Sequence, residues 1–77
     1  GKNSFAAIFG LIKFRRSLFF VKDINAGEMV TNEHVKSIRP GYGLPPKYFE
    51  KIIGKIIIND VEKGSPVKSE MFKGLNF

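Results

Sequence analysis

The pattern of hydrophobic and polar positions occurs twice along the chain. When the sequence is shifted against itself by a constant offset, "VKDINAGEMVTNEHV" (Val21 to Val35) lies over "INDVEKGSPVKSEMF" (Ile58 to Phe72). Four positions are identical, and apolar residues match apolar residues, as where Ile24 pairs with Val61. The match predicts two copies of one structural unit, related by a pseudo-two-fold axis.

Each copy combines an apolar strand, a glycine turn and a single helical turn. The strands are predicted at residues 18–22 and 55–58. Gly27 and Gly64 supply the backbone freedom that the tight turns after them require. Side chains able to cap the helical turns that follow are Asn32 and Ser69.

The segment between the copies adds a strand, a rigid loop and one helix. A strand is predicted over Val35–Arg39, and the loop "PGYG" follows it. "LPPKYFEKIIG" opens with two prolines and stops at Gly54, which predicts the main helix within Pro45–Ile53. The sequence therefore predicts a mostly β domain with short helices.

Length and composition set the limits of this fold. A chain of 77 residues with 43% hydrophobic content can form one domain with one core. It has no cysteine, which excludes a disulfide framework and fits a reducing compartment, so a cytoplasmic location is expected. The apolar run Phe5–Ile12 is too short to span a bilayer, so no membrane contact is expected. Because the chain begins with Gly, we expect a piece of a longer protein, with residues 1–13 a linker or poorly ordered N-terminal segment and 14–77 the domain.

The net charge of +6, from thirteen Lys and Arg against seven Asp and Glu, raises the question of nucleic-acid binding. The cations are spread from Lys2 to Lys73, and their tightest cluster is "KFRR", Lys13 to Arg16. No RNA-binding sheet motif, helix-turn-helix or zinc-finger spacing appears. A solvated basic surface is the favoured interpretation.

The residue types of an active site do not come together in this sequence. His34 is the only histidine, and the repeat places it over Met71, which favours a packing or surface role. Asp23 and Asp60 occupy equivalent turn positions, where Asp normally accepts hydrogen bonds from backbone N–H groups. We therefore predict no catalytic residue, no metal ligand and no cofactor within this domain.

Arg39 is the candidate binding residue. It precedes a proline, which favours an extended backbone, and two glycines follow within four residues, so the guanidinium is held on a stiff support. Its five donors suit a carbonyl, a carboxylate or a phosphate. From spacing alone, an ordinary surface arginine in a local ion pair remains the alternative.

Several motifs taken together resemble a known module. "RRSL", "DINAGE", "RPGYG" and "PPKY" followed by "GK" resemble the C-terminal antifreeze-like (SAF) domain of the sialic acid synthase family. Bacterial enzymes that make sialic, legionaminic or pseudaminic acid look most similar. The resemblance covers about Phe14 to Phe72 and implies a β-clip fold, shared with type III fish antifreeze proteins. That fold agrees with the pseudo-two-fold repeat.

The resemblance also implies a role for Arg39. In the family, a TIM barrel precedes this domain and condenses phosphoenolpyruvate with an N-acylated amino sugar, using a divalent metal (Mn or Mg) held by the barrel. The enzyme is a domain-swapped homodimer in which each antifreeze-like domain lies over the barrel of the partner subunit. The arginine of the "RPG" motif, Arg39 here, reaches the acylamino group of the sugar. The isolated domain is then expected to bind substrate without being catalytic.

Two other functions of the same fold are open at this point. An antifreeze protein needs a flat, largely uncharged face, whereas this chain has one Thr and 26% charged residues. An exported SAF-type assembly chaperone would be expected to carry a signal peptide and would not account for "RPGYG". The sequence favours the domain that caps a synthase active site over both.

Overall fold

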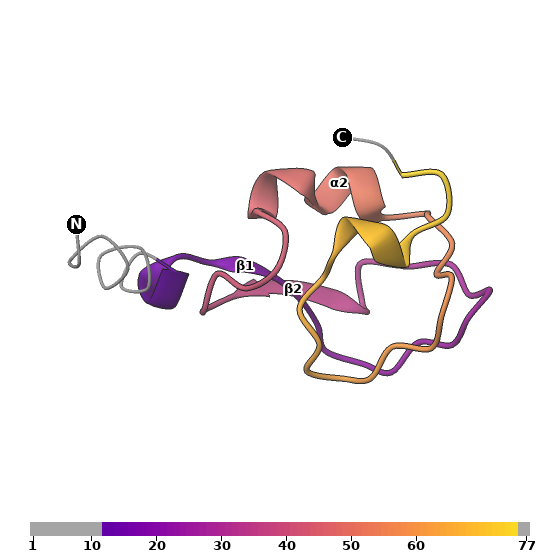
Figure 1. Ribbon diagram of the computed structural model, residues 1–77, viewed down its shortest axis with the longest axis horizontal. Helices are drawn as coiled ribbons and strands as arrows, with labels where there is room; N and C mark the ends of the chain where they lie inside the picture. Colours follow the sequence, from indigo (N-terminus) through magenta and orange to yellow (C-terminus); the bar gives the residue numbers. More distant parts are fainter. Residues whose placement is uncertain (1–11, 76–77) are drawn as a thin grey trace.

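The computed structural model describes residues 12–75, and its regular elements are short (Figure 1). Strand β1 (Ser17–Phe20) pairs with β2 (Val35–Ile38) in an antiparallel ladder that sets Ser17 opposite Ile38. The remaining elements are the 3-10 helix η1 (Pro46–Tyr48), helix α2 (Phe49–Ile52) and the 3-10 helix η2 (Ser69–Met71). The predicted mostly β domain with short helices is confirmed.

The internal repeat is visible in reciprocal backbone contacts. Ile24 and Val61 donate hydrogen bonds to each other's carbonyl oxygens at 3.0 and 2.8 Å, and they mark the pseudo-two-fold axis. The bridge between Phe19 and Pro66 has its counterpart, at the same offset, in the bridge between Met29 and Ile56. Figure 1 shows the two turn segments, purple and orange, running side by side. The pseudo-symmetric architecture expected from the sequence is therefore observed.

The two aspartates tie the copies together. The Oδ1 atom of Asp23 accepts a hydrogen bond from the backbone N–H of Lys63, and that of Asp60 accepts one from Ala26, both at 2.7 Å. Each carboxylate thus bonds a turn, as predicted, but the turn belongs to the other copy. Gly27 and Gly64, at φ +87° and +95°, provide the left-handed backbone of these turns.

We expect Asp23→Ala and Asp60→Ala to lower the free energy of unfolding by similar amounts, because the two hydrogen bonds are equivalent. Each charge-assisted bond is exposed, so the loss should lie near the low end of about 1.5–3 kcal/mol. Urea melts of both single variants test this expectation. Losses that differ by more than about 1 kcal/mol would contradict the equivalence of the copies.

The core lies between the two copies and under α2. Leu18 and Phe20 of β1 are buried, as expected of the apolar strand predicted at residues 18–22. Phe20 stacks on Phe72 with ring centroids 6.5 Å apart, and Ile52 closes the core from α2. No helix among residues 12–75 has the length and apolar character needed to cross a membrane.

Ile24 and Val61 give the clearest test of this core. Their exposed fractions are 1% and 7%, so truncation to alanine leaves a cavity in a site that cannot collapse freely. We expect Ile24→Ala to cost about 2–4 kcal/mol and Val61→Ala, which removes less volume, a value near the lower limit. Denaturant melts measure both, and near-neutral effects would show that the assignment of the core is wrong.

Some local expectations differ from the structure. Residues 55–58, predicted as a strand, form only isolated bridges, because Ile56 pairs with Met29 and the next residue, Ile57, pairs with Phe72. Ser69 lies inside η2, whose first turn has no side-chain cap. In the first copy the side chain that bonds the turn is Thr31, to the N–H of Glu33 at 3.3 Å, and not the predicted Asn32.

The predicted linker, residues 1–13, lies outside the described residues except for its last two positions. Ile12 and Lys13 belong to a helical turn at residues 12–14. The carbonyl of Ile12 accepts a hydrogen bond from the N–H of Gly41 at 2.7 Å. The folded part therefore includes residues that the sequence analysis assigned to the linker.

Candidate functional site

The candidate site is built on the loop that joins β2 to η1, residues 39–45. One buried hydroxyl, that of Ser17, forms hydrogen bonds to two residues in the first part of this loop. Ser17 is 1% exposed, and its Oγ donates to the carbonyl of Pro40 at 2.8 Å and accepts from the N–H of Gly43 at 2.9 Å. A single side chain on β1 thus holds both ends of the "PGYG" turn. Sequence analysis missed Ser17, although it is the polar residue that opens the apolar strand "SLFFV".

Gly43 brings the same loop against the backbone of both copies. A Cβ atom at this position would lie 2.2 Å from the carbonyl oxygen of Leu18 and 2.9 Å from the nitrogen of Val67. These distances are far inside van der Waals contact, so only glycine fits. The loop therefore cannot drift outward without losing its contacts to Leu18 and Val67.

Arg39 is exposed at the start of this loop, as expected. Its Nε donates to the carbonyl oxygen of Phe14 at 2.8 Å, which fixes one edge of the guanidinium against the helical turn at residues 12–14. The peptide bond between Arg39 and Pro40 is cis. The Nη1 and Nη2 atoms donate to no residue in the described range, so the outer edge of the fork faces solvent.

The local ion pair left open by the sequence is not formed. Among residues 12–75 the ion pair present joins Lys22 and Glu33, at 3.7 Å, and Arg39 has no carboxylate within that distance. The charge of Arg39 therefore remains available to an external acceptor. A guanidinium with a free outer edge suits an oxygen acceptor, bound by one or two parallel N–H groups.

Exposed apolar residues occur near Arg39 along the chain and at the backbone group that it bonds. Ile38 precedes it and is 40% exposed, Tyr42 lies three positions later and is 47% exposed, and Phe14, whose carbonyl Arg39 bonds, is 70% exposed. Lys68 donates to the carbonyl of Tyr42 and ties the loop to the second copy. Aromatic side chains around an arginine are the composition of a contact surface.

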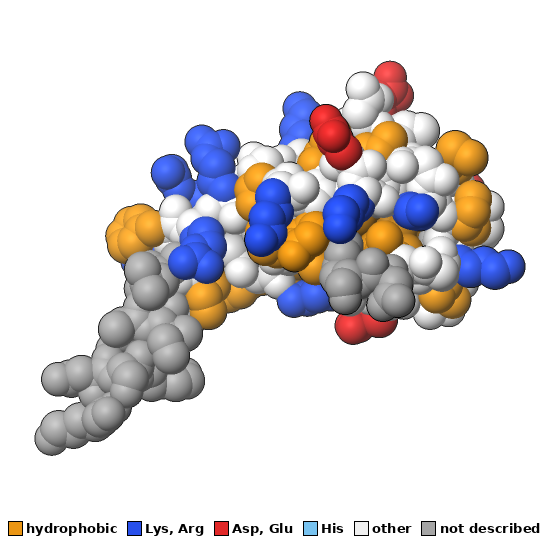
Figure 2. Space-filling view, turned by 90° about the horizontal axis from the view of Figure 1, so that it is seen from above, with side chains coloured by type: hydrophobic (Ala, Val, Ile, Leu, Met, Phe, Trp, Pro, Cys, Tyr) orange, Lys and Arg blue, Asp and Glu red, His pale blue; other side chains and the backbone are white. Residues whose placement is uncertain are grey.

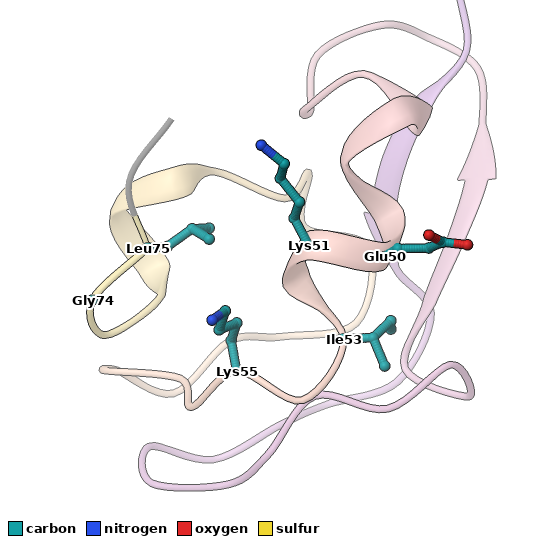
Figure 3. A pocket seen from close by; sticks show the side chains of 6 residues that line it. All are labelled: Glu50, Lys51, Ile53, Lys55, Gly74 and Leu75. Carbon is teal, nitrogen blue, oxygen red and sulfur yellow. The ribbon is translucent and has the colours of Figure 1, made fainter.

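Arg39 lines neither of two hollows that flank α2 in the described part of the chain. A hollow of about 430 Å³ lies between α2 and the C-terminal residues, lined by Glu50, Lys51, Ile53, Lys55, Gly74 and Leu75. Figure 3 shows Lys51, Lys55 and Leu75 directed into it, while Glu50 and Ile53 point away. A second hollow, of about 380 Å³, lies on the Met29–Asn32 side of α2. Neither hollow includes a residue of the 39–43 loop.

The other candidate groups have structural roles. His34 is half-buried, and its Nδ1 lies 3.0 Å from the backbone nitrogen of Thr31, where it closes a turn. No group of three or more His, Asp or Glu able to hold a metal occurs within residues 12–75. Figure 2 shows Lys and Arg side chains spread over the face, with apolar side chains among them, and no single basic band.

Comparison with known proteins places the chain in a family. The SAF domain model matches residues 15–73. The pseudaminic acid synthase of Campylobacter jejuni (strain 81-176) is 43% identical over 60 residues, which cover 78% of this chain. The match covers only 18% of that enzyme, so the chain spans less than a fifth of the curated relative.

Solved structures show the same fold. The spore coat polysaccharide biosynthesis protein of Bacillus subtilis superposes with a TM-score of 0.73 at 26% identity, over 91% of this chain and 21% of that one. The antifreeze-like domain of human N-acetylneuraminic acid phosphate synthase superposes with a TM-score of 0.72 at 20% identity, over 78% and 77%. The β-clip fold of antifreeze-like domains, expected from the motifs, is confirmed, and the chain belongs to the SAF domain family.

Proposed function

We propose that this chain is the substrate-capping domain of a nonulosonic acid synthase, an enzyme that condenses phosphoenolpyruvate with an N-acylated amino sugar. In this proposal Arg39 donates hydrogen bonds from Nη1 and Nη2 to the acylamino oxygen of the sugar. The sugar itself is held mainly by the catalytic barrel of a partner subunit in a homodimer. The domain supplies one binding group and covers the site.

The observation that carries this proposal is an exposed arginine whose guanidinium is fixed at Nε and has no ion-pair partner among the described residues. Arg39 also lies outside both hollows described above, on either side of α2. A ligand on an open surface has few contacts, whereas small-molecule sites enclose most of the ligand. In this proposal the rest of the site comes from a second surface, which meets the exposed Phe14 and Tyr42.

The family relationship supports the chemistry of the ligand. The curated relative is named as a pseudaminic acid synthase, and the human domain belongs to an N-acetylneuraminic acid phosphate synthase. The name of the curated relative agrees with a synthase as the parent enzyme, and in this proposal the ligand of Arg39 is the N-acylated sugar of that reaction. In this proposal phosphoenolpyruvate and the divalent metal bind to the barrel, so no residue of this chain is assigned to either.

The experiment is steady-state kinetics of the full-length synthase with Arg39→Ala, varying each substrate in turn. We expect impaired use of the sugar and little change in the KM for phosphoenolpyruvate. Unchanged kinetics for the sugar would end the proposal.

Ice binding is the weaker function for this chain. The single threonine, Thr31, is occupied by the N–H of Glu33 and by His34 Nδ1 at 2.9 Å, so its hydroxyl is committed within the fold. Charged side chains interrupt the surface seen in Figure 2. Thermal hysteresis of the purified domain is the direct measurement, and a clear positive would favour the antifreeze function over the capping function.

A further inference from the structure

We propose that Ser17 is a positioning residue for Arg39, because its hydroxyl sets the direction in which the guanidinium leaves the surface. This inference rests on the proposed function, since it concerns the same sugar site. Ser17 itself contacts no ligand: it is buried, and it acts through the loop that it holds.

The geometry of the hydroxyl supports this role. Ser17 Oγ donates to the residue directly after Arg39 and accepts from Gly43, so one atom spans the "PGYG" turn from its first residue to its last. Both bonds are of ordinary length, at 2.8 and 2.9 Å, and they use the hydroxyl as donor and acceptor at once. An alanine at this position would remove both bonds and add no volume.

Ser17 is one of several groups that anchor the loop. The chain segment that leads into β1 also bonds it through two carbonyl oxygens, Ile12 to the N–H of Gly41 and Phe14 to the Nε of Arg39. These two acceptors are backbone atoms, so a substitution does not remove them, and Lys68 holds the carbonyl of Tyr42 from the second copy. Ser17 is therefore an anchor whose contribution can be deleted while the other anchors keep Arg39 near its place.

A loop that has lost its bonds to Ser17 but keeps its other anchors should still fold but sample a wider range of orientations. The guanidinium would then meet the sugar oxygen in only part of the population, which weakens sugar binding. The loss of sugar binding in Ser17→Ala should be smaller than the loss in Arg39→Ala, which removes the guanidinium itself. Phosphoenolpyruvate does not contact this loop in the proposed arrangement, so its KM should not change.

The test is steady-state kinetics of the full-length synthase with Ser17→Ala, with Ser37→Ala as the matched control. Ser37 lies on β2, two residues from Arg39, is half-buried, and makes no side-chain hydrogen bond within the described residues. We expect Ser17→Ala to raise the KM for the sugar by about 3-fold or more, below the roughly 100-fold that a misplacement of about 1 Å can cost. The KM for phosphoenolpyruvate, and both constants of Ser37→Ala, should stay within 2-fold of wild type.

Ser17→Cys provides a graded second variant. Its sulfur is a weak donor and acceptor of similar shape, so the KM for the sugar should fall between wild type and alanine. If Ser17→Ala does not fold, the KM of Ser17→Cys for the sugar tests the positioning role instead. Hydrogen–deuterium exchange adds a readout besides activity, because peptides covering residues 40–43 should exchange faster in the Ser17 variants than in wild type or Ser37→Ala.

The outcomes separate the two proposals. Normal sugar kinetics and unchanged exchange in the Ser17 variants, beside impaired kinetics in Arg39→Ala, would overturn the role of Ser17 and leave the function of Arg39 intact. Equal losses for both substrates would show that Ser17 is merely structural, which also overturns the inference. Normal sugar kinetics in Arg39→Ala would overturn the proposed function and, with it, the positioning role.

Discussion

Gly43→Ala should destabilise the domain by at least about 3 kcal/mol, the upper end of the usual cost of overpacking a close-packed site. The added methyl group would lie 2.2 Å from the carbonyl oxygen of Leu18, which already accepts a hydrogen bond from the N–H of Val67 at 2.9 Å. Leu44 continues this arrangement, since it accepts from Leu18 and donates to Val67, both at 2.9 Å. Because every obstructing atom belongs to a bonded backbone, no side-chain rotation can make room.

Gly41→Ala is the matched control for this prediction. Its Cβ would meet the Arg15 Cβ and the Ile12 carbonyl oxygen, both at 3.2 Å, so shifts of a few tenths of an ångström suffice. We expect a loss of about 1 kcal/mol, within the usual range for point substitutions. Denaturant melts of both variants give the comparison. Equal stabilities for Gly43→Ala and Gly41→Ala would show that the loop does not approach Leu18 and Val67 as closely as described.

The repeat made the framework of the fold accessible from the sequence. Gly27 and Gly64 mark turns because a left-handed backbone is a local requirement that glycine meets. The constant offset between the copies also implied the axis, and Ile24 and Val61 lie on it. These inferences depend on the residue type and on its neighbours within a few positions in the sequence.

Contacts between distant positions could not be inferred in the same way. Asp23 was correctly expected to bond a turn, but two equivalent turns exist, and the sequence does not distinguish the near one from the far one. Ser17 and Gly43 are 26 positions apart, and a serine at the start of an apolar strand is an ordinary residue. The close approach at Gly43 is a property of three chain segments, so no local pattern predicts it.

In the candidate site, too, local features could be predicted from the sequence, whereas contacts between distant residues could not. A stiff presentation of Arg39 is a prediction from "RPGYG", since proline and glycine act on the adjacent backbone. The bond from its Nε to Phe14 was not predicted, because that acceptor is a backbone carbonyl 25 positions away. This bond changes the chemistry of the site, since it leaves only the outer edge of the guanidinium for a ligand.

Arg39→Ala in the full-length synthase should lower kcat/KM for the N-acylated sugar by about ten- to a hundred-fold. A hydrogen bond from a charged donor contributes about 1.5–3 kcal/mol, and this loss appears directly in kcat/KM. Arg39→Lys should recover only part of the loss, because an ammonium group cannot bond Phe14 and offer a planar fork to the sugar at once. The KM for phosphoenolpyruvate should change little in either variant.

Arg15→Ala is the matched control, because Arg15 is an exposed arginine at the same end of the domain and its removal changes the net charge equally. If sugar use depended on the overall positive charge, both alanine variants would lose activity together and high salt would reduce wild-type activity as well. Arg39 lies on the surface, and its charge-assisted bond to Phe14 is exposed, so Arg39→Ala should cost about 1.5 kcal/mol of stability, near the low end for such bonds. A melt of the variant domain therefore separates the two roles: an unfolded domain would make Arg39 structural, whereas a folded domain with selectively impaired sugar kinetics would make it the sugar-binding residue.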